Sequence, residues 1–130
     1  MEERRRKKGW LRDLIAAYGH KAGELNFIFL DDEALLQINM TYLNHSTYTD
    51  IITFDHSEQE NRIEGDVFIS VDRVMENAAK FKTTFERELL RVMAHGVLHL
   101  LGFKDKKTDE VQAMRQAEDQ ALELYFRESA

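Results

Sequence analysis

The stretch MAHGVLHLLGFKD, residues 93–105, decides how the rest of this chain folds. His95 and His99 stand four residues apart, which places their two imidazoles on the same side of a helix. Gly102 follows three residues after the second histidine, and Asp105 follows three residues after the glycine. This spacing is typical of a metal site in which a helix supplies two ligands, the chain turns, and a third ligand folds back.

The helix that carries the histidines is predicted to lie in the middle of the protein. Residues 85–101 are apolar on nearly all sides of a helix, and such a helix is buried. Thr83 followed three residues later by Glu86 predicts a capping box at its start, and Gly102 predicts its end. The two histidines therefore belong to a buried and rigid element, in which an imidazole needs a polar partner.

Two interpretations of these residues remain open from the pattern alone. Histidines at this spacing also occur as core or surface residues without a metal, and Asp105 could belong to a charged surface turn with its lysine neighbours. The metal interpretation is favoured by the apolar helix, the glycine turn and the carboxylate spacing together. Imidazole and carboxylate suit Zn, Ni, Mn or Fe(II), and a catalytic zinc keeps a position for water beside three protein ligands.

We therefore expect one divalent ion, zinc first with Ni, Mn or Fe as alternatives, held by His95, His99 and Asp105. The ion would acidify its bound water, and the resulting hydroxide would hydrolyse a phosphodiester or an amide. We assign no catalytic residue beyond this metal-bound water. Because Asp105 is a carboxylate, the metal-bound water should be less acidic than in a site with three histidines. The preference of the site among metal ions should also move toward Mn, Fe(II) or Mg.

The remaining pattern predicts an α+β fold. Helices are expected at 10–18, 32–42, 74–81 and 108–126, and strands at 25–30, 51–54 and 66–71, with a polar loop at 57–64. Gly19 and Gly23 should end the first helix. With the central helix, the order helix, strand, helix, strand, strand, helix, helix, helix is typical of a single α+β domain.

Composition limits the classes of function. The 130 residues suit one domain, 1–130, in which the basic residues 1–9 are expected to form a frayed terminus. The absence of cysteine excludes disulfides and thiolate ligands. We find no membrane span and no secretory signal, and expect a cytoplasmic protein. A net charge of −6 argues against broad non-specific nucleic-acid binding, and no DNA binding is expected.

The run at 93–105 resembles the signature of the YbeY family of metal-dependent hydrolases, bacterial endoribonucleases implicated in ribosomal RNA maturation. Two further stretches, Thr49–Phe54 and Gly65–Ser70, resemble strand motifs of the same family, and Asn39 and Tyr42 also match. The resemblance covers about residues 24–126. The residues of the main motif that match are His95, Gly96, Leu98, His99, Leu100, Gly102 and Phe103.

The resemblance implies a zincin-like single domain, with a small mixed β-sheet flanked by helices and a buried central metal-binding helix. It also implies single-stranded RNA as substrate, in particular a ribosomal RNA precursor, and the ribosome or ribosome-associated proteins as partners. Asp50, Thr49 and Asp66 occupy family motif positions, although a structural role for them is an equal alternative.

This chain departs from the family at three places. Asp105 stands where relatives usually carry histidine, and Leu43 stands where they usually carry an arginine that is thought to serve catalysis. Arg91, His45 or Lys104 could replace its charge. The family's N-terminal strand would fall within residues 1–9, whose basic residues make a poor strand.

Two other functions compete with an RNA hydrolase. One is a metalloprotease-like hydrolase, although Gly96 occupies the position at which metalloproteases carry a glutamate base. The other is a non-catalytic ribosome-assembly factor, which the leucine at position 43 favours more than any other residue does.

Overall fold

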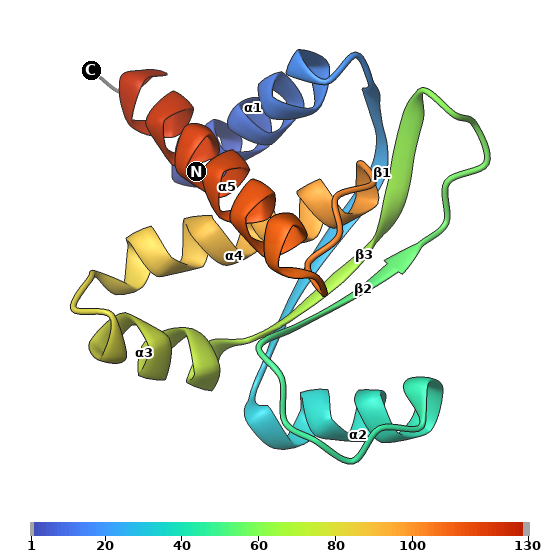
Figure 1. Cartoon of the computed structure of the whole chain (residues 1–130), viewed down its shortest axis with the longest axis vertical. Coiled ribbons are helices and arrows are strands. Elements are labelled where there is room, and N and C mark those ends of the chain that lie inside the picture. Colours follow the sequence, from blue (N-terminus) through green and yellow to red (C-terminus); the bar gives the residue numbers. More distant parts are fainter. Residues whose placement is uncertain (1, 129–130) are drawn as a thin grey trace.

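The computed structural model describes residues 2–128, with side chains from residue 5 onward. Its element order is the one expected, so the α+β fold class is confirmed (Figure 1). No helix in this part of the chain has both the length and the apolar character needed to cross a membrane. The elements are α1 (Glu2–Ala17), β1 (Lys21–Leu30), α2 (Asp32–Leu43), β2 (Ile51–Asp55), β3 (Arg62–Ser70), α3 (Val71–Lys80), α4 (Phe85–Leu100) and α5 (Thr108–Glu128).

The three strands form the small mixed sheet that the family resemblance implied. Their order is β1-β3-β2, so the central strand is the last in sequence. β1 runs parallel to β3, with Phe27 opposite Val67, whereas β2 runs antiparallel to β3, with Thr53 opposite Val67. Because β3 has a strand on each side, it is the most buried of the three.

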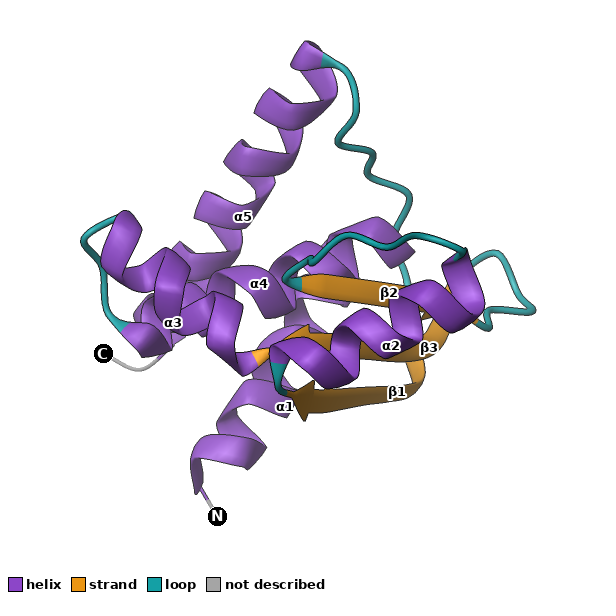
Figure 2. Cartoon of the chain, turned by 90° about the horizontal axis from the view of Figure 1, so that it is seen from below, coloured by secondary structure: helices purple, strands orange, loops and turns teal. Residues whose placement is uncertain are grey.

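Successive side chains of each strand point to opposite sides of the sheet, so its two faces differ. Val67 and Ile69 are fully buried in the main core, on the side where α4 packs. The intervening Phe68 points to the opposite face, where its ring meets that of Phe54 at 5.7 Å. Phe54 in turn contacts Tyr42 of α2 at 6.0 Å. The sheet therefore separates α2 from α4, as seen when the molecule is viewed from below (Figure 2).

Helix α4 lies between the sheet and α5, with α3 packed at its N-terminal half (Figure 1). The prediction that it is buried is confirmed, since Leu90, Ala94, Val97 and Leu98 have no exposed surface. Its second half carries both histidines, so two of the three predicted metal ligands lie on a largely buried helix.

The start of α4 differs from the prediction. The N-cap is Thr84, whose hydroxyl accepts a hydrogen bond from the Arg87 N–H at 3.0 Å. Thr83 instead donates its own N–H to the carbonyl of Ala78, at the end of α3. Between the two helices Lys82 adopts a left-handed φ of 57°. The tight turn between α3 and α4 thus uses Thr83, and the helix begins one residue later.

The basic N-terminus is helical, which corrects the expectation of a frayed segment at residues 1–9. Of these residues, Met1 lies outside the described part of the chain. α1 starts at Glu2 and not near Trp10, and no residue from 2 to 9 is in a strand. Arginine, lysine and glutamate are good helix formers. A run of basic residues at a terminus can therefore continue the helix that follows it.

Contacts with α5 and α4 hold this helix in place. Trp10 is fully buried and donates its indole N–H to the Ala121 carbonyl at 2.7 Å. The Arg6 guanidinium lies 4.0 Å from the centre of the Tyr125 ring, and Lys7 pairs with Glu86 at 3.6 Å. Tertiary packing therefore extends the helix well beyond the amphipathic segment seen in the sequence.

The boundary between α1 and β1 also differs in part from the prediction. Gly19 adopts a φ of 77°, which favours glycine, and ends the helix as expected. Gly23, expected to do the same, lies inside β1, which begins at Lys21 and not at Leu25. The pairing of β1 with β3 shifts register between Ala22 and Leu25. The glycine therefore marks an irregularity in the strand, a place where glycine is common.

Gly96 lies where α4 packs closely against the sheet. A Cβ atom at this position would lie 2.9 Å from Val67 Cγ1 and 3.0 Å from Ile51 Cδ1. Both distances are shorter than ordinary carbon–carbon contacts. Any side chain at position 96 would therefore push the helix away from β2 and β3.

This contact gives a prediction for stability. Gly96→Ala should lower the free energy of unfolding by about 1–3 kcal/mol, because overpacking outweighs the better helix propensity of alanine. Gly9→Ala is the matched control in α1, where the added methyl group has open space, and it should raise stability by about 0.5–1 kcal/mol. Urea unfolding measures both. A Gly96→Ala variant as stable as the parent would contradict the close contact.

Candidate metal site

The structure brings the three predicted residues together. The imidazole rings of His95 and His99 are 4.5 Å apart and nearly perpendicular, at 81°. The carboxylate oxygen Oδ2 of Asp105 lies 3.3 Å from Nε2 of His95 and 3.2 Å from Nε2 of His99. One donor atom from each residue falls within 4.8 Å of the others, so the group could hold a metal ion.

Asp105 reaches the histidines because the chain turns sharply after α4. Gly102 adopts a φ of 108°, a conformation that other residues rarely adopt. Its N–H bonds to the His99 carbonyl at 3.0 Å, and the Phe103 N–H bonds to the Leu98 carbonyl at 2.9 Å. These two bonds close the end of the helix and direct the chain back toward its own histidine face.

Each histidine is oriented through its Nδ1 atom. His95 Nδ1 lies 2.6 Å from a carboxylate oxygen of Glu118, and His99 Nδ1 lies 3.0 Å from the Phe103 carbonyl. Since a carbonyl or carboxylate only accepts, Nδ1 is the donor in both rings. Nε2 of each ring faces Asp105. In the neutral tautomer with the proton on Nδ1, Nε2 carries the lone pair that a metal ion needs. Such partners are typical of histidines that bind metals.

Glu118 of α5 is the functional residue that the sequence analysis missed. It is 6% exposed, and Arg91 holds its other oxygen at 3.1 Å. Arg91 also binds Asp119 at 2.8 Å. In sequence, Glu118 falls on the buried face of α5, next to Ala117 and in line with Leu122. A carboxylate on an apolar helix face was the available signal, because such groups are rarely buried without a partner.

The carboxylates around His95 raise the pKa of its imidazole. Burial lowers the pKa of the His95 imidazole, but the hydrogen bond and charge of Glu118, together with the charge of Asp105, raise it above its usual value. Burial also lowers the pKa of Arg91, and its bonds to Asp119 and Glu118 reverse that effect. The cluster thus has an excess of negative charge that suits a cation.

Two cavities meet at this cluster, and Asp50, His95 and Asp105 line both of them. The first, of about 470 Å³, lies against β2 and the loop before it. The second, of about 300 Å³, lies between α3, α4 and α5. The metal-site residues therefore stand in a cleft that continues on both sides of them.

The residues considered as replacements for the family arginine have different positions. Leu43, which stands at the arginine position, lines the first cavity together with His45. Arg91 lines the second cavity but is engaged by Glu118 and Asp119. Of Arg91 and His45, only His45 lines the first cavity, beside Leu43 and the two histidines.

The loop before β2 is held in place by Asn39, one of the residues that match the family. Asn39 is buried and donates its side-chain N–H to the Thr47 carbonyl at 2.8 Å. The Thr49 hydroxyl reaches the Ile51 carbonyl at 3.4 Å. The carbonyl of Asp50 accepts the Ser70 N–H at 2.9 Å. Asp50 lines both cavities.

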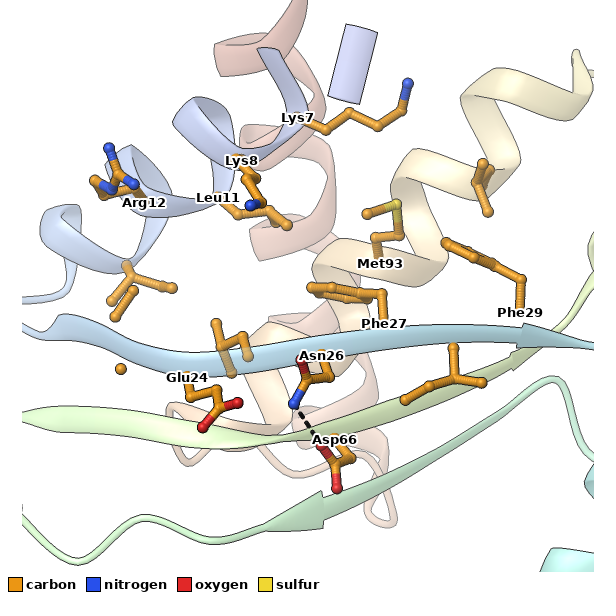
Figure 3. Close-up of a pocket in the computed structure, with 16 residues that line it drawn as sticks. Lys7, Lys8, Leu11, Arg12, Glu24, Asn26, Phe27, Phe29, Asp66 and Met93 are labelled. Carbon is orange, nitrogen blue, oxygen red and sulfur yellow. Dashed lines mark hydrogen bonds between the residues drawn. The ribbon is translucent and has the colours of Figure 1, made fainter. Parts of the chain in front are cut away.

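Asp66 lies apart from the metal-site residues. It lines a different cavity, of about 1120 Å³, between α1 and β1 (Figure 3). Its carboxylate accepts a hydrogen bond from the Asn26 amide at 3.1 Å and pairs with His56 at 3.1 Å. These two bonds lower the pKa of Asp66, against the opposing effect of burial. The side chain therefore joins β3 to β1 and to the loop after β2.

Comparisons with known proteins agree with the fold and the site. The family model described as endoribonuclease YbeY matches residues 3–125. An endoribonuclease YbeY from Cytophaga hutchinsonii is 49% identical over 124 residues, 95% of this chain and 87% of the relative. One from Flavobacterium psychrophilum is 50% identical over 116 residues, 89% of this chain and 82% of the relative.

A solved structure shows the same architecture. The solution structure of TM1509 from Thermotoga maritima superimposes with a TM-score of 0.69 at 26% identity, covering 94% of this chain and 80% of that one. The family model covers nearly all of the described residues, and these two relatives are identical to this chain at about half of the aligned positions. This chain belongs to the YbeY endoribonuclease family.

Proposed function

We propose that this protein is a metal-dependent endoribonuclease that hydrolyses phosphodiester bonds in single-stranded RNA. The observation that carries the proposal is the convergence of two imidazole Nε2 atoms and one carboxylate within 4.8 Å, where two cavities meet. A strand of RNA could cross this point with one nucleotide in each cavity. The relatives' name, endoribonuclease, supports RNA as the substrate.

In this proposal His95, His99 and Asp105 hold one divalent ion, with zinc expected first. The donor set fits, since each Nδ1 already has an acceptor of its own and both Nε2 atoms converge on an anionic oxygen of Asp105. When bound, such an ion makes its water acidic enough to supply hydroxide near neutral pH. Glu118 and the Phe103 carbonyl hold the imidazoles in the tautomer that coordination requires.

Local charge explains how an acidic protein can act on RNA. Non-specific binding needs many phosphate contacts, and the net charge of −6 does not favour them. A divalent ion would put positive charge only where the scissile phosphate lies. The protein would then recognise RNA mainly through its cleft, where Asp50 and His45 are among the polar residues that line the cavity on the β2 side.

The biological substrate we propose is a ribosomal RNA precursor, with the ribosome or ribosome-associated proteins as partners. Membership of the family supports this assignment. The cytoplasmic location expected from the sequence belongs to the same proposal.

The two competing functions differ in how well they fit the structure. A metalloprotease with the usual glutamate base is disfavoured, because Gly96 has no space for a side chain against Val67 and Ile51. A non-catalytic assembly factor is favoured by Leu43, which puts an apolar group in the cavity where relatives carry an arginine. The second alternative therefore needs a direct test of activity.

The role of Glu118 gives a prediction for metal binding. Glu118→Gln should weaken zinc binding by roughly 10–100-fold, because His95 loses the charged acceptor that orients it. Asp119→Asn is the matched control, since Asp119 binds Arg91 and not His95, and its effect should be much smaller. Competition with a chromophoric chelator at fixed pH measures both. Equal affinities for the two variants would contradict the proposed role.

Activity can be tested with protein purified without a histidine tag. We expect cleavage of unstructured RNA that is abolished by a chelator, restored by added divalent metal, and absent from the His95→Ala, His99→Ala double variant. Structured RNA and casein serve as alternative substrates, and thermal unfolding confirms that the variant is folded.

Each alternative predicts a different result in this experiment. RNA cleavage that survives chelation or the double substitution would overturn the proposal. Metal-dependent cleavage of casein alone would indicate a protease. Intact ribosome binding without cleavage of any substrate would indicate the assembly factor.

A further inference from the structure

A buried carboxylate in the second cavity has no partner among the described residues. Glu88 is 6% exposed and lines the cavity between α3, α4 and α5. No hydrogen bond or ion pair within the described part of the chain reaches its side chain. Among the described residues, Tyr125 Oη is the one fully buried side-chain polar atom without a partner. The Glu88 oxygens are therefore not sealed in the core, and they are open to a ligand in the cavity that supplies hydrogen-bond donors.

Glu88 is placed to contact a group beside the metal-site residues. It precedes His95 by seven residues on α4, which corresponds to two helical turns, or roughly 10 Å along the axis. Both residues line the same cavity, together with Asp105. A nucleotide next to a phosphate held at His95 and Asp105 would therefore extend toward Glu88.

An unpaired guanidinium lines this cavity as well. Arg115 of α5 makes no hydrogen bond or ion pair with another described residue. Burial, with the charges of Asp50 and Glu118, raises the pKa of the Glu88 carboxyl above its usual value, against the opposing charges of Arg91 and Arg115. Arg91 is already bound to Glu118 and Asp119. Glu88 and Arg115 are thus an acceptor group and a donor group for a ligand, beside Asp50 and Asn77 in the same cavity.

Apolar side chains also line the cavity. Phe81, at the end of α3, is 54% exposed, and Val111 of α5 is 46% exposed. Exposed aromatic rings of this kind stack against the unpaired bases of single-stranded RNA. The cavity of about 300 Å³ is at the lower end of the size range of small-molecule sites, which suits a single base.

The chemistry of the two polar groups selects among the bases. Guanine has two adjacent N–H donors, N1–H and N2–H₂, which match the two oxygens of a carboxylate. Its O6 and N7 acceptors match an arginine fork. Adenine and cytosine instead place one donor beside one acceptor on that edge, and uracil has a single N–H donor there.

We propose that this cavity is a guanine subsite for the nucleotide next to the scissile phosphate, in which Glu88 accepts from N1–H and N2–H₂ and Arg115 donates to O6 and N7. The subsite rests on the proposed RNA-cleaving function. It makes Glu88 a specificity-determining residue and Phe81 the surface on which the base stacks.

The test uses unstructured oligonucleotides of cytidine and uridine that contain one variable nucleotide. With guanosine there, kcat/KM for cleavage beside it should exceed that for adenosine by roughly 10-fold or more, since a bidentate contact discriminates strongly between bases. Inosine, which lacks the N2 amine, should fall between them. Glu88→Gln and Arg115→Met should each bring the guanosine-to-adenosine ratio close to one.

Glu86→Gln is the matched control, because it makes the same change in the same helix on a side chain that pairs with Lys7 at the surface. It should leave the ratio and the rate unchanged. Thermal unfolding establishes that each variant is folded. A merely structural role for Glu88 would lower all rates without changing the ratio between bases, and that result would overturn the subsite.

Binding separates this inference from the proposed function. Fluorescence anisotropy with labelled forms of the same oligonucleotides, in the presence of chelator, measures base preference without cleavage. A guanosine preference that Glu88→Gln removes, without cleavage of any RNA when metal is added, would support the subsite and overturn the nuclease. Cleavage with equal rates for all bases would overturn the subsite alone. A preference for adenosine or cytidine would overturn the assignment to guanine.

Discussion

The close packing of α4 on the sheet at Gly96 is the constraint on which the rest of the site depends. With no side chain at this position, the helix rests directly on Val67 and Ile51. The helix face that carries His95 and His99 is thereby fixed relative to β2 and to the loop before it. α5 packs against the same helix from the other side and brings Glu118 to His95. Buried packing, and not the metal-site residues themselves, sets the positions of the imidazoles.

Hydrogen bonds then fix the orientation of the two imidazole rings. Glu118 and the Phe103 carbonyl take the Nδ1 protons, so both Nε2 atoms face the carboxylate of Asp105. Arg91 balances Glu118 and Asp119, and it is therefore committed to the support of the site and not available to replace the family arginine. The same helix face continues to Glu88, which has no such support. This difference separates a carboxylate that orients a histidine from one that faces a cavity.

Sequence patterns predicted the elements that local periodicity determines. The apolar residues of α4, the turn at Gly102 and the order of helices and strands were all visible, because burial imposes helical or alternating spacing. The helical N-terminus was not, since its stability comes from Trp10 and Arg6 contacts with α5, more than 100 residues away. The cap at Thr84 was missed because the local rule favoured the threonine that the preceding turn uses.

Only the part of the candidate site that is close in sequence could be predicted. His95, His99 and Asp105 are close in sequence, and their spacing alone indicated that they could meet. Glu118 and Glu88 were not identified, because a carboxylate on a helix gives no sign of whether its partner is water, an arginine or a histidine. Only the packing of α5 on α4 shows that one of them orients an imidazole and that the other is buried without a partner.

The central claim is that these three residues hold one divalent ion through the two Nε2 atoms and the Asp105 carboxylate. Anomalous diffraction from crystals of untagged protein grown with zinc or manganese tests this directly. We predict one strong anomalous peak in contact with His95 Nε2, His99 Nε2 and a carboxylate oxygen of Asp105. A peak bound through Nδ1, or a fully loaded protein with no peak between these residues, would contradict it.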